Sequence, residues 1–252
     1  MKTQNLLKTS LLAGAVALAM GFASSAFGQT ILVDCGADGS ILANGSPTSS
    51  PDINGNTWNN SIPSAMNVAN LKSTANSATG ISLTWTNVGS GANTNPLGAT
   101  AAPGLLNIAT AYQDAIFTTT TTPGASFYLG GLDPSKTYTI SLFGSRDDST
   151  TVRYTTYTVT GASALTPTTI QTTGLNVGGT GINHNIANLA TFSNVVPNGS
   201  NDITVNYVVG AGSTASFGYL NAMEITVVPE PATWGLLAFS LTTVMVLRRR
   251  RS

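Results

Sequence analysis

Charged side chains are scarce in this sequence, and their scarcity limits what the protein can bind. Asp, Glu, Lys and Arg make up 8% of the 252 residues. Residues 29–228 contain four bases and nine acids, which gives this stretch a net charge of −5. The bases are Lys72, Lys136, Arg146 and Arg153, and the acids are Asp34, Asp38, Asp52, Asp114, Asp133, Asp147, Asp148, Asp202 and Glu224. Such a surface repels phosphate groups, so we expect no nucleic acid partner.

Cysteine and histidine each occur once, which excludes several kinds of site. Cys35 cannot form a disulfide within one chain, and one Cys with one His cannot supply the ligands of a structural zinc site. Cys35 follows an apolar run and is predicted to be buried, with pairing between two chains as the alternative. His184 lies in the Gly- and Asn-rich stretch 178–185, where we expect a solvated loop histidine.

Helix signals are also nearly absent, whereas strand signals recur. Short segments alternate apolar and polar residues with a period of two, and Gly- and Pro-containing turns separate them. The predicted strands are residues 30–33, 81–86, 137–142, 203–209 and 217–228, the last broken at Asn221 and Glu224. Residues 105–117 show helical spacing and predict a short helix. We therefore expect an all-β fold, a single antiparallel β-sandwich of jelly-roll-like form, over residues 29–228.

The N-terminus has the three parts of a secretory signal peptide, which we assign to residues 1–28. Lys2 and Lys8 form the positive region, and residues 11–22 are apolar. Ala26-Phe27-Gly28 supplies small residues for cleavage before Gln29, and cleavage after Ala26 is the close alternative. An uncleaved membrane anchor is the other interpretation of this segment.

The C-terminus, residues 229–252, reads as a membrane segment followed by a basic tail. The apolar run 232–247 is 16 residues long, or about 24 Å as a helix, somewhat shorter than the ~30 Å hydrocarbon core. Residues 248–251 are four arginines, which are costly to move across a bilayer. We therefore predict a single transmembrane helix with its C-terminus in the cytoplasm and the body outside. An ordinary single-span tail anchor has the same pattern.

The combination at this end resembles the PEP-CTERM sorting signal of Gram-negative bacteria. It consists of the triplet Pro229, Glu230 and Pro231, the apolar run, and the cluster Arg248, Arg249, Arg250 and Arg251. The resemblance implies that an exosortase recognises the segment, cleaves near the triplet and passes the body from the inner membrane to the cell surface or extracellular matrix. In that interpretation these residues form a recognition tag on a substrate.

Two segments of the body resemble malectin-like and related carbohydrate-binding β-sandwiches. Residues 52–60 (DINGNTWNN) resemble their opening motif, and residues 218–225 (GYLNAMEI) resemble their closing strand. Residues 142–146 and 153–157 resemble strands common in PEP-CTERM surface proteins. The resemblance implies a sugar-binding fold, although the sequence offers no clear aromatic platform for a sugar ring.

The residues around the Asn-Gly turn at 54–55 are the candidate ligand-binding site. Asp52, Asn54 and Asn56 place oxygen atoms at alternate positions, which partly matches a calcium loop, but Pro63 stands where the bidentate Glu belongs. Asp34, Asp38, Asp147 and Asp148 are other oxygen donors for a structural Ca²⁺ ion. Trp58 either stacks on a sugar beside Asn59 and Asn60 or anchors the loop in the core. Trp85 is predicted to be a core residue.

Three functions are compatible with these patterns. We favour an exported, non-enzymatic surface or matrix protein without a cofactor, which makes weak contacts with extracellular polysaccharide. The second is a secreted glycan-active hydrolase that uses carboxylates among Asp52, Asp147 and Asp148. The third is a structural matrix protein without a ligand. Because Arg146 and Arg153 flank the two adjacent acids, we also predict a buried Arg–Asp pair that ties a loop.

Overall fold

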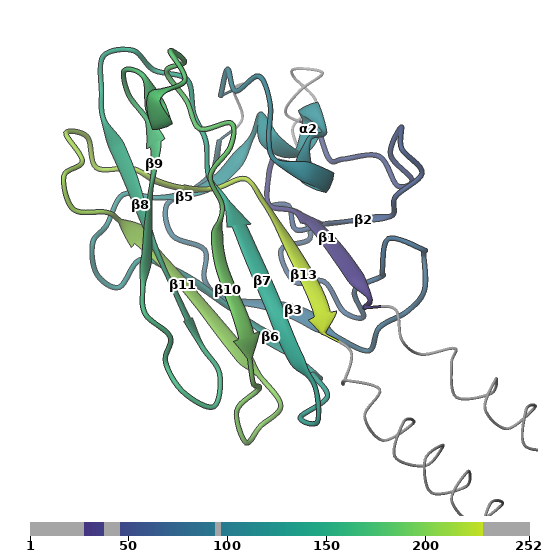
Figure 1. Ribbon diagram of the computed structural model, residues 1–252. Helices are drawn as coiled ribbons and strands as arrows, with labels where there is room; N and C mark the ends of the chain where they lie inside the picture. Colours follow the sequence, from purple (N-terminus) through teal and green to yellow (C-terminus); the bar gives the residue numbers. More distant parts are fainter. Residues whose placement is uncertain (1–27, 38–45, 94–96, 229–252) are drawn as a thin grey trace, which may run out of the picture. The chain divides into compact units, whose positions relative to one another are not determined.

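The computed structural model describes residues 28–37, 46–93 and 97–228 (Figure 1). Residues Gln29–Val228 form one compact unit. Residues 1–27 of the predicted signal peptide and the whole predicted sorting signal, with the span 232–247, lie outside the described residues. Among the helices that are described, none has the length and apolar character needed to cross a membrane.

The body consists almost entirely of β-strands, arranged in two five-stranded sheets and one three-stranded sheet (Figure 1). In spatial order the first sheet contains β10 (Ala190–Val195), β7 (Thr137–Phe143), β13 (Ala222–Val228), β1 (Thr30–Asp34) and β2 (Trp58–Asn60). The second contains β3 (Ser82–Asn87), β6 (Ala125–Gly130), β11 (Ile203–Val209), β8 (Arg153–Thr160) and β9 (Thr168–Thr173). The third contains β12 (Gly218–Leu220), β5 (Ala115–Thr118) and β4 (Gly91–Asn93). The predicted all-β class is confirmed.

The main hydrophobic core lies between the two large sheets, as in a β-sandwich. Strand β8 shows the reason, because its residues alternate between buried and half-buried along the strand. The core contains Ile31, Ile140 and Ile225 from the first sheet and Leu83, Phe127 and Val205 from the second. Trp85 packs with its ring 5.0 Å from that of Phe127, and its Nε1–H donates to Ser61 Oγ at 2.8 Å. The prediction that Trp85 is a core residue is confirmed.

The predicted strand 217–228 is divided at Asn221, as the sequence indicated. The break predicted at Glu224 is wrong, because Glu224 lies within β13 and pairs with Leu32 and Ser141. Asn221 is fully buried, and its Nδ2 donates to the carbonyls of Tyr112 and Ser145 at 2.9 and 3.1 Å. Its Oδ1 accepts the backbone N–H of Ser145 at 2.8 Å. Because the amide replaces backbone partners, the chain can leave the small sheet after β12 and enter the first large sheet as β13 without unpaired groups.

A covering segment, residues 97–114, packs on the outer face of the first sheet. It contains a 3₁₀ turn, η2 (Gly104–Leu106), and a single helical turn, α2 (Ala109–Tyr112). Leu106 and Tyr112 from this segment form a second apolar cluster with Leu32 and Phe143 from the sheet. The outer face of the sheet is therefore buried where this segment lies. Another 3₁₀ turn, η3 (Val177–Gly179), follows β9.

Two details differ from the expectations. The predicted helix 105–117 is reduced to η2 and α2, because residues from Ala115 onward pair as β5 with β4 and β12. The sandwich is also not purely antiparallel, since β1 and β2 run parallel, with Leu32 beside Trp58 and Asp34 beside Asn60. A long loop between these two strands allows the parallel pairing.

Candidate functional site

The turn that begins at Asp52 is closed by the Asp52 carboxylate itself. Its Oδ1 accepts the backbone N–H groups of Asn54 and Asn56, both at 2.8 Å, and its Oδ2 accepts the Nε1–H of Trp58 at 2.9 Å. Burial would raise the pKa of Asp52, but the hydrogen bonds from Trp58, Asn56 and Asn54 outweigh it and hold the pKa below its usual value. The carboxylate is therefore ionised at neutral pH.

This arrangement uses the proposed ligand oxygens internally. Both oxygens of Asp52 face N–H donors, and the Asn56 side chain turns its Nδ2, not its carbonyl oxygen, toward Asp52 Oδ2 at 3.4 Å. Asn54 is exposed and reaches Asp52 through its backbone. A calcium loop needs these oxygens to converge on the ion. The spacing of Asp52, Asn54 and Asn56 is thus explained by a self-closed turn.

The sequence allowed two roles for Trp58, stacking on a sugar or anchoring the loop in the core. The structure shows the second. The Trp58 side chain is 3% exposed and packs in the cluster beneath the covering segment. No ring face is therefore available for stacking on a sugar. The hydrogen bond to Asp52 satisfies the buried indole N–H, so that Trp58 anchors the turn to the sheet.

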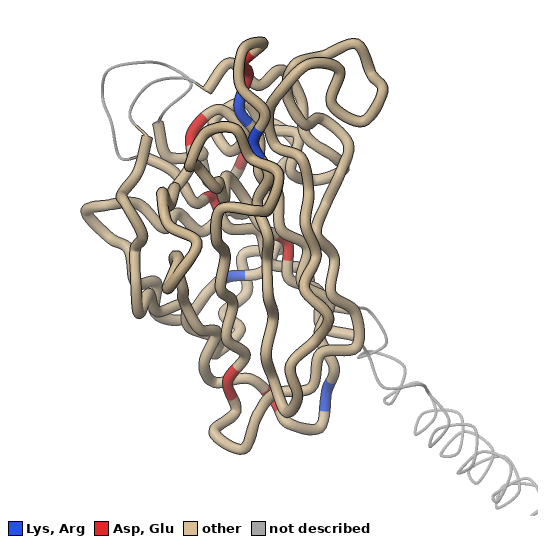
Figure 2. Tube along the Cα trace, turned by 90° about the vertical axis from the view of Figure 1, so that its left-hand side faces the viewer, with Lys and Arg blue, Asp and Glu red and all other residues tan. Residues whose placement is uncertain are grey.

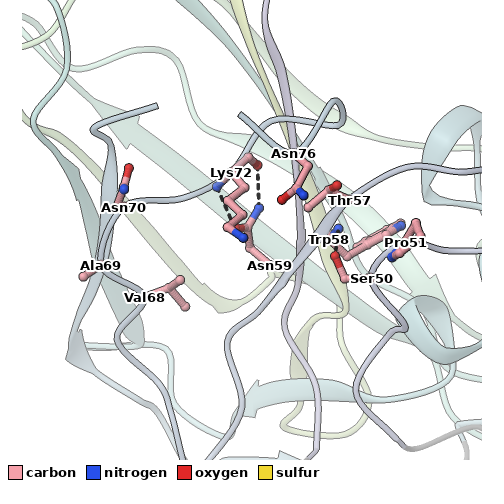
Figure 3. A pocket seen from close by; sticks show the side chains of 10 residues that line it. All are labelled: Ser50, Pro51, Thr57, Trp58, Asn59, Val68, Ala69, Asn70, Lys72 and Asn76. Carbon is pink, nitrogen blue, oxygen red and sulfur yellow. Dashed lines mark hydrogen bonds between the residues drawn. The ribbon is translucent and has the colours of Figure 1, made fainter. Parts of the chain in front are cut away.

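A polar groove lies beside this anchored turn, with a cavity of about 450 Å³ (Figure 3). We call it the Asn-rich groove. Its lining residues are Ser50, Pro51, Thr57, Trp58, Asn59, Val68, Ala69, Asn70, Lys72 and Asn76. These residues belong to three parts of the chain: the turn with the residues just before it, β2, and the segment 68–76. Contacts with β2 hold this segment in place.

Asn59 is the residue that joins the two walls of the groove. Its Nδ2 donates to the carbonyls of Leu32 and Lys72 at 3.0 and 2.8 Å, and its Oδ1 accepts the Lys72 N–H at 2.8 Å (Figure 3). Asn70 uses its Oδ1 to accept the backbone N–H of Gly80 at 2.9 Å. The Asn76 amide and the Lys72 ammonium have no protein partner among the described residues, and both residues are exposed.

The groove can therefore offer amide, hydroxyl and ammonium groups to a ligand, beside small apolar surfaces at Pro51 and Val68. An amide both donates and accepts hydrogen bonds, which matches the hydroxyl groups of sugars. No carboxylate is among the lining residues. The groove thus suits binding of a neutral or anionic polar ligand and lacks an acid–base pair.

The predicted Arg–Asp pair is present, and it involves Arg153 and Asp148. Arg153 Nη2 lies 3.0 Å from Asp148 Oδ2, and the guanidinium lies over the ring of Phe217 at 5.1 Å. Hydrogen bonds from the hydroxyl of Thr151 and from Thr150, with the nearby Arg153, hold the pKa of Asp148 well below its usual range. Arg146 instead donates to the Tyr219 hydroxyl at 3.2 Å. Other charged residues are few in the described part of the chain (Figure 2).

His184 corrects the expectation of a solvated loop histidine. It is 3% exposed, and its Nε2 accepts the backbone N–H of Thr100 at 3.1 Å. Its Nδ1 lies 3.6 Å from Asp147 Oδ1. The covering segment buries this loop, and a contact between residues 84 positions apart leaves no local signal in the sequence.

The three acids of the hydrolase hypothesis do not have the properties of a catalytic pair. Asp52 and Asp148 have lowered pKa values, whereas a general acid at neutral pH needs a raised one. Asp147 pairs with His184. The carboxyls with raised pKa values are Asp34 and Asp114, and both are fully buried. Among the residues that the structure describes, no three His, Cys, Asp or Glu side chains gather as a metal site.

Sequence reasoning found the turn and Trp58 but missed most of the groove. The segment that contains Asn70, Lys72 and Asn76 has neither strand nor helix periodicity. It also contains no motif that predicts a binding site. The left-handed backbone at Asn70 and Asn76, with φ of 57° and 61°, is a conformation that Asn tolerates well. The clustering of Asn residues between 54 and 76 was the one feature that could have indicated it.

No family model matches the sequence, and no curated protein matches it. The solved structures with partial similarity include the ANX1 ectodomain from Arabidopsis thaliana, with 16% identity, a TM-score of 0.42 and coverage of 58% of this chain. The ANXUR1 extracellular domain, also from Arabidopsis thaliana, has 16% identity, a TM-score of 0.38 and coverage of 54% of this chain. This chain covers 41% of each of those structures.

Proposed function

We propose that the protein is exported to the cell surface or extracellular matrix, where its body binds polysaccharide weakly and without catalysis in the Asn-rich groove. An exosortase releases it from the inner membrane through the C-terminal signal. The binding proposal rests on the residues that line the groove. They provide free amide and ammonium groups together with uncharged hydroxyls, and they include no carboxylate. The sorting part rests on the sequence of residues 229–252.

The chemistry of the groove favours an anionic sugar. Lys72 is the single cation in the lining and is exposed, so its ammonium can pair with a uronate carboxylate. The neighbouring Asn70 and Asn76 side chains can bind the ring hydroxyls. Each such hydrogen bond contributes about 0.5–1.5 kcal/mol net, and no aromatic face adds to them, so we expect a Kd on the order of 0.1–1 mM.

The binding test compares two lysine variants of the full chain in mild detergent. Affinity electrophoresis through gels that contain a soluble polyuronate should retard the wild-type protein. Lys72→Gln should weaken binding about fivefold, the equivalent of ~1 kcal/mol. Lys136→Gln is the matched control, because Lys136 is exposed and pairs with Asp133 at 3.4 Å outside the groove. No retardation of the wild type, or equal losses in both variants, would overturn the binding proposal.

The sorting test is mass spectrometry of the mature protein from its host. We expect a chain that has lost Arg248 to Arg251, with its new end near Pro231. A mature chain with the complete arginine tail would overturn exosortase processing and would leave a membrane-tethered protein. This result would not affect the groove, because the two proposals depend on different parts of the chain.

A further inference from the structure

Two buried carboxyl groups near the end of β1 have no cation to balance them. Asp34 is the last residue of β1, and Asp114 is the last residue of the covering segment; both are 0% exposed. Asp34 Oδ2 accepts the backbone N–H of Thr48 at 2.8 Å, and Asp114 Oδ2 accepts that of Ala37 at 2.7 Å. Neither acid takes part in an ion pair found among the described residues. Burying unpaired carboxylates is costly, so this arrangement requires an explanation.

Each of these acids also has one oxygen without a partner, and a third acceptor is in the same condition. The buried atoms without a hydrogen bond include Asp34 Oδ1, Asp114 Oδ1 and Asn60 Oδ1. The orientation of the Asn60 amide follows from its Nδ2, which donates to the Thr48 carbonyl at 3.0 Å. These three atoms are oxygen acceptors, the kind of group that a cation can satisfy.

The strand register places Asp34 and Asn60 next to each other. In the parallel pair β1–β2, Asp34 lies beside Asn60, just as Leu32 lies beside Trp58. Leu32 and Trp58 pack beneath the covering segment, and side chains two residues apart on a strand share a face. Asp34 and Asn60 therefore lie on the same covered face, in strands about 5 Å apart.

Asp114 approaches this place from the covering segment. Its carboxyl lies so close to Gly36 that a Cβ on that residue would be 2.2 Å from Asp114 Oδ2. Only glycine leaves room for the carboxyl at this position. The Ala37 N–H donates to the same carboxyl at 2.7 Å. The Asp114 side chain therefore lies against residues 36 and 37, two to three positions after Asp34.

We propose that Asp34, Asn60 and Asp114 bind a structural Ca²⁺ ion, which joins the ends of β1 and β2 to the covering segment. The ligands are two carboxylates and an amide carbonyl, the hard oxygen donors that Ca²⁺ prefers, and backbone carbonyls or water complete its shell of six to eight oxygens. One divalent ion balances both carboxylates and gives each unpaired oxygen a partner.

The donor set distinguishes this site from a structural zinc site. Structural zinc sites are built from cysteine and histidine ligands, whereas Asp34, Asn60 and Asp114 offer only oxygen, which suits Ca²⁺.

The test measures thermal unfolding of the full chain, in mild detergent, by tryptophan fluorescence. Calcium sites of extracellular modules have Kd values of about 10⁻⁴–10⁻³ M. At about 10 mM CaCl₂ the melting temperature should therefore rise by about 3–10 °C over the value in EDTA. Equilibrium dialysis should find one bound Ca²⁺ ion per chain at this site. Magnesium should produce a smaller shift, because it demands a tighter octahedral shell.

Three variants locate the ion. Asp34→Asn and Asp114→Asn keep the shape of the side chain and should each abolish the calcium-dependent shift. Asp202→Asn removes one negative charge outside the site and should keep the wild-type shift. A wild-type melting temperature that is equal in calcium and EDTA would overturn the proposal and indicate that the acids share a proton. A shift that persists in both site variants would also overturn it, since the ion would then bind elsewhere.

Discussion

Replacing Asp52 by Ala should destabilise the body strongly, because this carboxylate is the only acceptor that the structure shows for three N–H groups. The Trp58 Nε1–H is buried and would be left without a partner, at a cost of about 2–3 kcal/mol. The N–H groups of Asn54 and Asn56 lie nearer to solvent and regain water, so each contributes about 0.5–1 kcal/mol. The total loss is about 3–5 kcal/mol.

Urea unfolding and thermal melting both measure this loss. For a domain of this size, about 2–4 °C in melting temperature accompanies each kcal/mol, so Asp52→Ala should lower it by about 6–20 °C. Asp52→Asn should lose less, because its remaining oxygen can still accept the two backbone N–H groups. Trp58→Phe removes the indole donor and keeps a buried aromatic ring.

A double-mutant cycle then isolates the bond between the two side chains. Asp52→Ala combined with Trp58→Phe should show a coupling energy of about 1–2 kcal/mol, because either change alone breaks the same hydrogen bond. If Asp52→Ala cost less than about 1 kcal/mol, or the two changes were additive, the carboxylate would not be the hub of this turn. In that case the oxygens of Asp52 would be available to a ligand after all.

Two further predictions concern other buried groups. Cys35 is fully buried and its pKa is raised. A thiol reagent should therefore modify it at least about a hundredfold more slowly in the native protein than in denaturant. Rapid labelling of the native protein, or a disulfide-linked dimer on a non-reducing gel, would contradict its structural role. Asp148 has a lowered pKa in the folded state, so the stability it contributes should be fully present above its unfolded pKa, near 3.8. It should decrease below that value and be lost as the pH falls through the lower folded pKa. Urea unfolding at about pH 7 and pH 3 should therefore show a stability difference between wild type and Asp148→Asn that shrinks in acid, whereas an unchanged difference would refute the assignment.

Much of the sandwich was predictable because its strands carry a local pattern. The alternation in residues 137–142 and 203–209 appears in the structure as β7 and β11, with alternate side chains buried between the sheets. Asn221 was recognisable as a break because a polar amide interrupts an apolar run. The Arg–Asp pair was also predictable, because Arg146 and Arg153 flank two adjacent aspartates in a sequence with few other charges.

The candidate site was predictable only in part. Asp52 and Trp58 were identified from the turn signal, but the choice between ligand contact and core anchor depended on burial by the covering segment, which has no distinct pattern. The groove needs Asn59 to hold the stretch around Lys72, a contact across 13 positions. His184 was misjudged for the same reason, since its burial comes from Thr100.

The sequence by itself determined the scarcity of charge, the strand periodicity, the single thiol and the apolar and basic runs at both termini, because each is a property of composition or of neighbouring residues. Only the tertiary structure decided that β1 and β2 run parallel, with Asp34 beside Asn60, and that Asp114 is buried against residues 36 and 37. The physical reason is that alternation records whether a residue faces the core. It does not record which distant residue lies opposite, and packing of the whole chain settles that choice.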